Sequence, residues 1–364
     1  MSLRFGLVGY GAWGRVHAGA IEVTAGAELV AIADRGEDEL AHARARHPGC
    51  FLSTDYRDVI ECREVDAVCV VVPNDLHEAV ALEALGAGKH VLLEKPMAHS
   101  LDGCERLLEA ARRAPGVLNV VHQLRVSSQW GTIKSLVDSG RVGEPLSLLI
   151  DLWRRPFRGG AGDWRYRLQT VGSWLLEELV HFVDLACWYL EALGPPETVY
   201  AVGNGRGGDA CLHDNLALVL RWPQGRYALL SQSLAGFEHH KTLQLTGTAG
   251  AVRGLWSASM DRSDDPVVSL RLLEGLRGAE RFDDIGPGTE LRLQSPSGEV
   301  HELTTLYARV LDSVRSGVPF IDAASAARAV GICLAAEQSI RDGREVRLAT
   351  FGHGVPWQSF REGG

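Results

Sequence analysis

The sequence predicts an α/β fold in two parts: a doubly wound parallel sheet, then an α+β domain with a large, mostly antiparallel open sheet and flanking helices. Short apolar strands alternate with helices as far as residue 122, the order typical of a parallel sheet with right-handed connections. From residue 123 this alternation stops, and many later segments have the two-residue periodicity of antiparallel strands. We therefore expect domains at residues 1–122 and 123–364, with the C-terminal helices free to pack back on the first.

Composition restricts the class of protein. The 364 residues are 46% hydrophobic and 23% charged, values ordinary for a globular protein with two cores. The net charge of −9 argues against a nucleic-acid partner or an anionic membrane surface. No uncharged apolar stretch approaches the roughly 18 residues of a membrane span, and the chain enters a strand too early for a signal peptide. Seven cysteines without a C-x-x-C pair fit a reduced, cytoplasmic protein.

The first turn carries the strongest signal. The apolar strand Leu3–Val8 leads directly into a G-x-G-x-x-G motif, followed by an apolar-periodic helix. The motif consists of Gly9, Tyr10, Gly11, Ala12, Trp13 and Gly14. Gly9 permits the tight turn, Gly11 permits close approach of a pyrophosphate, and Gly14 permits close packing of helix on strand. The helix N-terminus offers N–H groups to phosphates, so the motif predicts a Rossmann-type dinucleotide site.

A carboxylate follows the second predicted strand, residues 28–33. Asp34 lies twenty residues after Gly14, where a carboxylate meets the ribose hydroxyls of a dinucleotide. Asp34 favours NAD, because it would repel a 2′-phosphate. Arg35 can pair with that phosphate or cover the adenine ring, which leaves NADP as an alternative; a solvated arginine at the start of a loop fits equally well.

Further elements of the first domain follow in order. We expect helices at 37–47, 55–61, 75–85 and 101–114, and strands at 66–72, 90–93 and 117–121. Ligands of a parallel sheet bind outside the carboxyl ends of its strands. Besides the glycine turn and Asp34, the candidates at that edge are Pro73, Asn74, His77, Glu94 and Lys95.

These motifs resemble the Gfo/Idh/MocA family of glucose–fructose oxidoreductase, inositol dehydrogenase and rhizopine catabolism proteins. The resemblance rests on the glycine turn, on Pro73-Asn74-Asp75-Leu76-His77 and most specifically on Glu94-Lys95-Pro96, and it extends over nearly the whole chain. It implies a nicotinamide-dependent oxidoreductase in which Lys95 lies beside the nicotinamide and the reacting hydroxyl. A cation there stabilises negative charge on the substrate oxygen. The structural alternative is a surface lysine that caps a strand.

The second domain begins with a predicted helix and a long strand. We expect helices at 127–139, 173–190, 306–317 and 323–342, and strands at 145–153, 198–202, 216–222, 227–233, 242–246, 251–255 and 344–348. Residues 245–250 resemble the family's G-x-x-G turn between two such strands. One face of the sheet is expected to contact helices or another subunit. This free face, together with what the family resemblance implies, predicts a homo-oligomer, a dimer or a tetramer, formed through this sheet. The tail 352–364 either covers a neighbour or is disordered.

An unusual loop follows the strand 145–153. Arginines alternate with aromatic residues along residues 154–167, and Arg154, Trp164 and Arg165 are candidate substrate ligands. Sugar C–H faces stack on aromatic rings, while guanidinium groups donate to hydroxyls, carboxylates or phosphates. A basic surface loop or an oligomer contact is the alternative.

The helix 173–190 carries Glu177, His181 and Asp184 at spacings that put them on one helical face. By itself this pattern fits an ion pair or a core histidine. The family resemblance implies more, because its Asp-x-x-x-His helix supplies the usual proton acceptor, here His181. Glu177 replaces the usual Asp with one more methylene, and Val171-Gly172-Ser173 replaces a glycine run. Asp184 is interpreted as a structural carboxylate.

No metal site is expected. His239 and His240 are adjacent on a predicted strand, so their side chains point to opposite faces and cannot easily bind one ion. No H-E-x-x-H motif or Cys/His cluster accompanies them.

Together these features predict an NAD(P)-dependent oxidoreductase that transfers a hydride between the cofactor and a secondary alcohol or ketone of a sugar, sugar derivative or cyclic polyol. His181 takes the hydroxyl proton, Glu177 orients the reactants, and Lys95 polarises the oxygen. The hypothesis requires Lys95 and His181 to act on the same carbon. Two alternatives are a lyase or glycoside-cleaving enzyme whose tightly bound NAD oxidises the substrate transiently, and a non-enzymatic NAD or sugar sensor.

Overall fold

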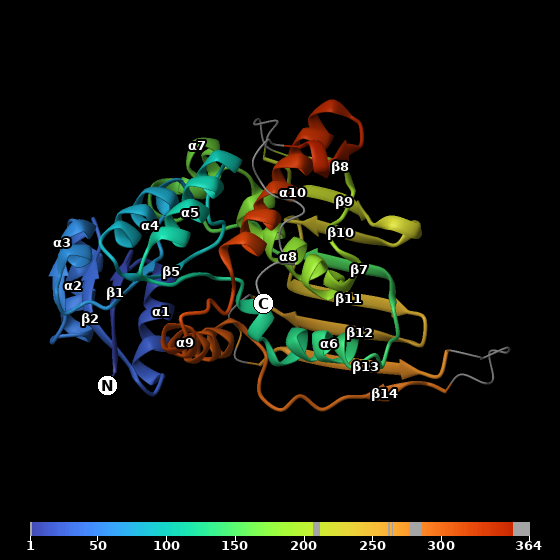
Figure 1. Ribbon diagram of the computed structural model, residues 1–364, viewed down its shortest axis with the longest axis horizontal. Coiled ribbons are helices and arrows are strands. Elements are labelled where there is room, and N and C mark those ends of the chain that lie inside the picture. The colour runs from blue at the N-terminus through green and yellow to red at the C-terminus, as the bar shows by residue number, and fades with distance from the viewer. Residues whose placement is uncertain (1, 207–211, 261–262, 264, 277–285, 352–364) are drawn as a thin grey trace. The chain divides into compact units, whose positions relative to one another are not determined.

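The computed structural model in Figure 1 describes residues 2–206, 212–260, 263, 265–276 and 286–351. The tail 352–364 considered above lies outside the described residues. The chain divides into two compact units. The first unit comprises Met1–Gln123, Gly159–Gly172 and Leu303–Val330, and the second unit comprises Leu124–Arg158, Ser173–Glu302 and Gly331–Gly364.

The first unit contains the expected doubly wound parallel sheet. Its six strands have the order β3-β2-β1-β4-β5-β6, and every pair is parallel. The strands are β1 (Leu3–Val8), β2 (Ala27–Ala33), β3 (Phe51–Ser53), β4 (Ala67–Val70), β5 (His90–Leu93) and β6 (Leu118–Val120). The strand order reverses between β1 and β4, and ligands of such sheets bind at the carboxyl ends beside that switch. The sequence analysis missed β3, which is too short to show a pattern.

Helices connect these strands. They are α1 (Ala12–Val23), α2 (Glu37–Arg46), α3 (Tyr56–Glu61), α4 (His77–Gly86) and α5 (Leu101–Arg113). Two have side-chain caps: Asp55 accepts from the Arg57 amide before α3, and Ser100 accepts from the Gly103 amide before α5. Such caps satisfy amides that lack partners within the helix, which fixes where each helix begins.

A segment from near the C-terminus completes the core of the first unit. The Tyr307 ring, on helix α9 (Glu299–Ser316), packs edge-on against Phe5 of β1 with centroids 5.3 Å apart. Asn119 of β6 is buried, and its Oδ1 accepts from the Phe320 amide at 2.8 Å. Helix α10 (Ala323–Asp342) begins in this unit and continues into the second.

The second unit is built on a nine-stranded sheet with the order β14-β13-β12-β11-β7-β10-β9-β8-β15. The strands are β7 (Pro145–Trp153), β8 (Thr198–Asn204), β9 (Asn215–Arg221), β10 (Tyr227–Ser233), β11 (His239–Gly247), β12 (Gly250–Ala258), β13 (Val267–Glu274), β14 (Thr289–Glu290) and β15 (Val346–Arg347). Among the described strands of this second sheet, only the β7–β10 pair is parallel, so the sheet is mostly antiparallel as predicted. Figure 1 shows β7 to β13 side by side as one layer. The sequence analysis missed β13 and β14.

One face of this sheet is buried under helices. Along β7, Leu148, Ile150 and Leu152 are buried, whereas Leu149 and Trp153, on the opposite face of the strand, are exposed. The helices of this unit include α6 (Ser128–Asp138) and α8 (Val180–Tyr189), which are joined by a hydrogen bond from the Tyr189 hydroxyl to the Trp130 carbonyl. Among the described residues, the structure contains no helix with the length and hydropathy of a membrane span.

We expect Asn119→Ala to destabilise the protein by about 1–3 kcal/mol, because the change removes a buried oxygen that accepts from the Phe320 and Ile321 amides and leaves Ser313 Oγ as the remaining acceptor of the Phe320 amide. Asn204→Ala is a matched control: Asn204 also accepts a hydrogen bond, but at an exposed site, and should cost less than about 0.5 kcal/mol. Urea unfolding measures both. Equal losses in the two variants would refute the anchoring role of Asn119.

Candidate functional site

The glycine turn after β1 has room for a ligand at one of its three glycines. Gly9 has a φ of +96°, and a Cβ there would lie 2.1 Å from the Val71 carbonyl oxygen. A Cβ on Gly14 would lie 2.0 Å from the Gly9 carbonyl oxygen. A Cβ on Gly11 would meet no described atom within 4 Å. The protein's own packing therefore requires glycine at positions 9 and 14, whereas the space at Gly11 fits close approach of a pyrophosphate.

The N-terminus of α1 adds an electrostatic preference for an anion. Gly11 is its N-cap and provides no side-chain cap, and no acidic residue stands in the first turn. The first amides of this helix and its dipole are therefore available to a phosphate. The residues present fit the pyrophosphate of a dinucleotide.

Asp34 fastens the glycine turn to the end of β2. One of its carboxylate oxygens accepts from the Tyr10 amide at 2.6 Å and the other from the Gly36 amide at 2.8 Å. Each oxygen keeps a second lone pair that can accept from a ribose hydroxyl. Arg35 beside it is exposed.

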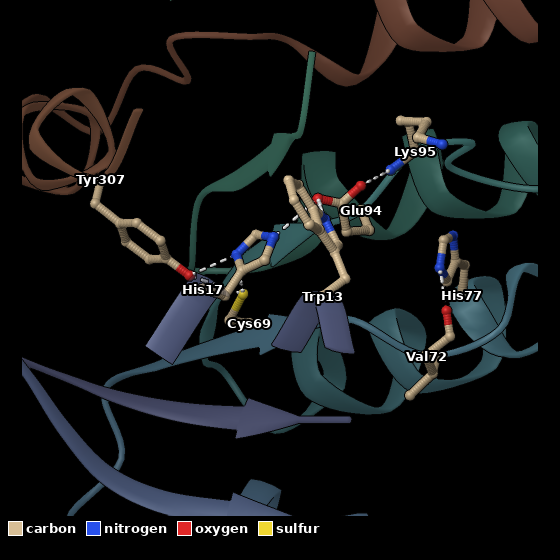
Figure 2. Close-up of polar contacts among 8 residues, drawn as sticks. All are labelled: Trp13, His17, Cys69, Val72, His77, Glu94, Lys95 and Tyr307. Atoms are coloured by element: carbon tan, nitrogen blue, oxygen red, sulfur yellow. Dashed lines mark hydrogen bonds and ion pairs between the residues drawn. The ribbon is translucent and has the colours of Figure 1, made fainter. Parts of the chain in front are cut away.

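The turn after β4 holds neighbouring loops in place. Pro73 precedes the 3₁₀ turn Asn74–Leu76, and the side-chain Nδ2 of the buried Asn74 donates to the Val171 carbonyl at 3.1 Å. His77 has Nδ1 2.7 Å from the Pro96 carbonyl and Nε2 2.9 Å from the Val72 carbonyl, the latter drawn in Figure 2. Burial lowers the pKa of His77, so the neutral ring donates to one of these carbonyls. His77 thus joins two loops, and its predicted contact with a cofactor stays a prediction.

The Glu-Lys-Pro turn at the end of β5 is connected to α1 through Glu94. This carboxylate is buried, and its Oε1 accepts from the Trp13 indole at 2.8 Å. Its Oε2 accepts from the Lys95 amide at 3.1 Å (Figure 2). The Lys95 side chain is half-buried, and the Lys95–Pro96 peptide is cis. The cofactor turn and Lys95 therefore share one anchor.

Sequence reasoning missed His17, whose Nε2 lies 2.9 Å from Glu94 Oε1. The available signal was its place on α1, three residues after Gly14 and among apolar residues. A buried histidine beside a nucleotide turn needs a polar partner, but sequence spacing alone could not identify Glu94 as that partner.

The helix of Glu177 and His181 is not α-helical throughout. Leu175–Leu179 is a π-helical turn, in which the Val180 amide bonds to the Leu175 carbonyl, and α8 follows it. The π turn changes the angular offset between positions four apart, so the α-helical spacing assumed from the sequence does not apply to Glu177 and His181. Both side chains are buried, at 4% and 6% exposure. Turns of this kind are often found at functional sites.

Asp184 forms a buried two-point ion pair with Arg125, a contact that fits the structural role predicted for it. Its two oxygens accept from Arg125 Nε at 2.7 Å and Nη2 at 2.5 Å, and the carboxylate is 1% exposed. The Arg125 guanidinium also lies 5.4 Å from the Trp188 ring centroid. A two-point pair of this kind fixes α8 rather than carrying protons.

The arginine and aromatic loop is divided between the units. Arg154 belongs to the second unit, where its Nη1 lies 2.5 Å from Glu178 Oε2 and its guanidinium covers the Phe157 ring at 4.4 Å. Trp164 and Arg165 belong to the first unit and stack on each other at 4.4 Å. Their roles as substrate ligands stay predictions. The same holds for the joint action of Lys95, in the first unit, and His181, in the second.

The adjacent histidines of β11 lie on opposite faces of their strand. His239 is buried, whereas His240 is partly exposed and lies 3.6 Å from Glu238. In the part of the chain that the structure describes, no group of three or more His, Cys, Asp or Glu side chains could hold a metal ion.

Comparison with known proteins finds two matching family models, one for each half of the chain. Residues 3–122 match the oxidoreductase family with an NAD-binding Rossmann fold, GFO_IDH_MocA, and residues 130–253 match a GFO/IDH/MocA C-terminal domain.

Two curated relatives and one solved structure are similar to the chain. Inositol 2-dehydrogenase of Klebsiella pneumoniae is 34% identical over 52% of this chain and 55% of that protein, about half its length. The 1,5-anhydro-D-fructose reductase of Ensifer adhaerens is 30% identical over 75% of this chain and 81% of that protein. An oxidoreductase from Desulfitobacterium hafniense superposes with a TM-score of 0.82 at 23% identity, over 96% of this chain and 98% of that one, and so has the same fold.

We expect Gly11→Ala to fold normally but to weaken NAD binding by about tenfold or more, because the new methyl group occupies space that only a ligand needs. Gly9→Ala should instead destabilise the fold, since its methyl group would overlap the Val71 carbonyl. Calorimetric titration with NAD and thermal unfolding separate the two effects. Unchanged NAD affinity in Gly11→Ala would place the pyrophosphate elsewhere.

Proposed function

The chain belongs to the Gfo/Idh/MocA family of oxidoreductases, and from this premise we propose that it transfers a hydride between NAD and a secondary alcohol or ketone of a sugar, sugar derivative or cyclic polyol. The observation that carries the proposal is the shared anchor at Glu94. This one carboxylate binds Trp13, on the helix of the cofactor turn, and the backbone amide of Lys95. The backbone at Lys95 is thereby fixed relative to the phosphate-binding turn.

Lys95, His181 and Glu177 each have a separate role in the proposed hydride transfer. NAD, when bound, supplies the hydride acceptor. Lys95 donates a hydrogen bond to the substrate oxygen and stabilises the negative charge that develops there. His181 accepts the hydroxyl proton, and Glu177 orients the imidazole or the substrate. In the reducing direction His181 returns the proton to the oxygen.

The substrate class follows from the relatives and from the polar loop. The relatives described above act, by their names, on inositol and on an anhydro sugar. We assign Arg154, Trp164 and Arg165 to substrate binding, because guanidinium and aromatic groups suit the hydroxyls and C–H faces of a ring polyol. Asp34 favours NAD, and Arg35 leaves NADP as the alternative cofactor. The free thiols of Cys50, Cys62 and Cys69 support a reducing, cytoplasmic location.

A screen of polyols, sugars and sugar acids with NAD and NADP in parallel, monitored by absorbance of the reduced cofactor, tests the proposal. For the best substrate, Lys95→Ala should lower kcat by on the order of 10²- to 10³-fold, because charge stabilisation in the transition state is lost. Its NAD affinity should stay within about threefold of the wild-type value.

Lys89→Ala is the matched control. Lys89 is also half-buried and precedes β5 at its opposite end, where it donates to the Cys62 and Val65 carbonyls at 2.9 and 2.7 Å. This variant should lose stability but keep kcat. Equal turnover in Lys95→Ala and the wild type would refute the role of Lys95. Substrate conversion without net reduced cofactor would favour transient oxidation over a dehydrogenase.

We propose that the protein is a homo-oligomer, a dimer or a tetramer, formed through the outer face of the second sheet. Tyr200, Val219, Leu229 and Leu149 form one row across four adjacent strands. Tyr200 and Leu149 are 42% and 38% exposed, and Trp153 and Val202 of the same sheet are also exposed. A contiguous apolar face of this kind is typical of a subunit interface.

Leu149→Arg should dissociate the oligomer to monomers, because it inserts a charge into the apolar row. Light scattering coupled to size-exclusion chromatography measures the mass. Val23→Arg is the control, since Val23 is 69% exposed on α1, outside this sheet. A wild-type protein of monomeric mass, or an unchanged mass in Leu149→Arg, would contradict the proposed interface.

A further inference from the structure

His17 is fully buried on α1 and contacts three other elements of the first unit (Figure 2). Its Nε2 lies 2.9 Å from Glu94 Oε1, at the end of β5. Its Nδ1 lies 2.9 Å from the Tyr307 hydroxyl of α9 and 3.4 Å from Cys69 Sγ of β4. The Tyr307 hydroxyl and Cys69 Sγ are themselves 3.1 Å apart. Each ring nitrogen therefore faces a group that can accept a hydrogen bond.

The surroundings of His17 favour its cationic form. Burial lowers the pKa of the imidazole, but the charge and hydrogen bond of Cys69 and those of Glu94 outweigh burial and raise this pKa to about 10. Burial likewise raises the pKa of Glu94, but the hydrogen bond and charge of His17, the charge of Lys95 and the Trp13 indole outweigh it and hold the pKa below its usual value. We therefore expect the two groups to form an ion pair at neutral pH, in which an imidazolium donates from Nε2 to Glu94 Oε1 and from Nδ1 to the Tyr307 hydroxyl or Cys69 Sγ.

The ionised state of Glu94 matters because of what else it binds. Its Oε1 also accepts from the Trp13 indole at 2.8 Å, and its Oε2 accepts from the Lys95 amide at 3.1 Å. A carboxylate accepts at both oxygens, whereas protonation turns one oxygen into an O–H donor and makes it a poorer acceptor. The Trp13 indole donates to one oxygen and the Lys95 amide to the other, so protonation of Glu94 would weaken or break at least one of these two hydrogen bonds.

We propose that His17 is a positioning residue of the reaction, whose imidazolium keeps Glu94 ionised so that this carboxylate holds both Trp13 of the cofactor turn and the backbone of Lys95. This inference rests on the proposed function in one respect: Lys95 is taken as the residue that polarises the substrate oxygen. His17 itself touches neither cofactor nor substrate in this role and acts through Glu94.

Loss of the imidazolium has a definite consequence. A buried carboxylate without its cation is strongly destabilised, and it relieves this by taking up a proton. The neutral carboxyl group then releases the Trp13 indole or the Lys95 amide. Misplacement of a catalytic group by about 1 Å costs up to about 10²-fold in rate, so the effect should appear in kcat.

The test compares four variants of the full-length protein: His17→Gln, Glu94→Gln, the double variant, and His90→Gln as a control. His90 is a half-buried histidine at the opposite end of β5, where its Nδ1 accepts from the Val117 amide at 3.0 Å. We expect His17→Gln to lower kcat by about 10- to 100-fold, with the polyol KM within about threefold. The double variant should be no slower than Glu94→Gln alone, because His17 acts through Glu94. His90→Gln should keep the wild-type kcat.

The pH profile distinguishes positioning from general loss of stability. In the wild type the His17–Glu94 pair should not titrate between about pH 6 and pH 9, given the raised pKa of His17 and the lowered pKa of Glu94. In His17→Gln the pKa of Glu94 should rise, so kcat should fall as the pH drops and recover as it increases. The other groups facing the pair, Cys69, Tyr307 and Lys95, are retained in this variant.

A measurement without substrate or cofactor keeps this proposal separate from the proposed function. Histidine side-chain NMR on the wild-type apoprotein, assigned through the backbone, should find the His17 ring still an imidazolium at pH 8. Any one of three results would overturn the positioning role, even if Lys95 proves essential. They are a neutral His17 ring at that pH, additive losses of kcat in the double variant, and a wild-type pH profile and kcat in His17→Gln. If no polyol is oxidised but the ring is cationic, the proposed function fails while the ion pair stands. If His17→Gln does not fold, the NMR result and the double variant still decide.

Discussion

A buried negative charge at the end of β5 joins the glycine-turn helix of the first unit to its Glu-Lys-Pro turn. The Glu94 carboxylate is 4% exposed, and a charge so far from water is tolerated only when hydrogen bonds and a counter-charge compensate for lost solvation. Trp13, His17 and the Lys95 amide provide that compensation. The same bonds that make the charge tolerable also fix the helix of the glycine turn to the Glu-Lys-Pro turn.

The surroundings of this charge come from distant parts of the chain. Tyr307, which bonds to His17, also packs on Phe5 of β1, and Asn119 of β6 accepts from the Phe320 amide that follows α9. The segment Leu303–Val330 is therefore part of the first unit's core although it follows the second sheet in sequence. The environment of the dinucleotide turn thus depends on a helix that the chain forms near its end.

In the second unit, an ion pair and a π-helical turn determine the geometry of the helical segment that carries Glu177 and His181. The two-point contact of Arg125 with Asp184 anchors α8, and the π turn Leu175–Leu179 changes the angular offset between Glu177 and His181. Periodicity placed Glu177 and His181 correctly on one helical segment, but it could not reveal the π turn. The apolar pattern of a π turn differs from that of an α-helix by a single residue, which is too little to detect in so short a stretch.

Local physics explains what the sequence by itself determined. The glycine positions, the parallel first sheet, the mostly antiparallel second sheet and the placement of Asp34 and Lys95 after strands follow from backbone sterics and hydrophobic periodicity, which act over a few residues. Tertiary structure alone decided the contacts of His17 with Glu94, 77 positions away in the sequence, and with Tyr307, 290 positions away. It also decided the division of the arginine loop between the two units. Burial sets the protonation of such groups and the partners they require, and burial is a property of the assembled fold that neither residue type nor spacing contains.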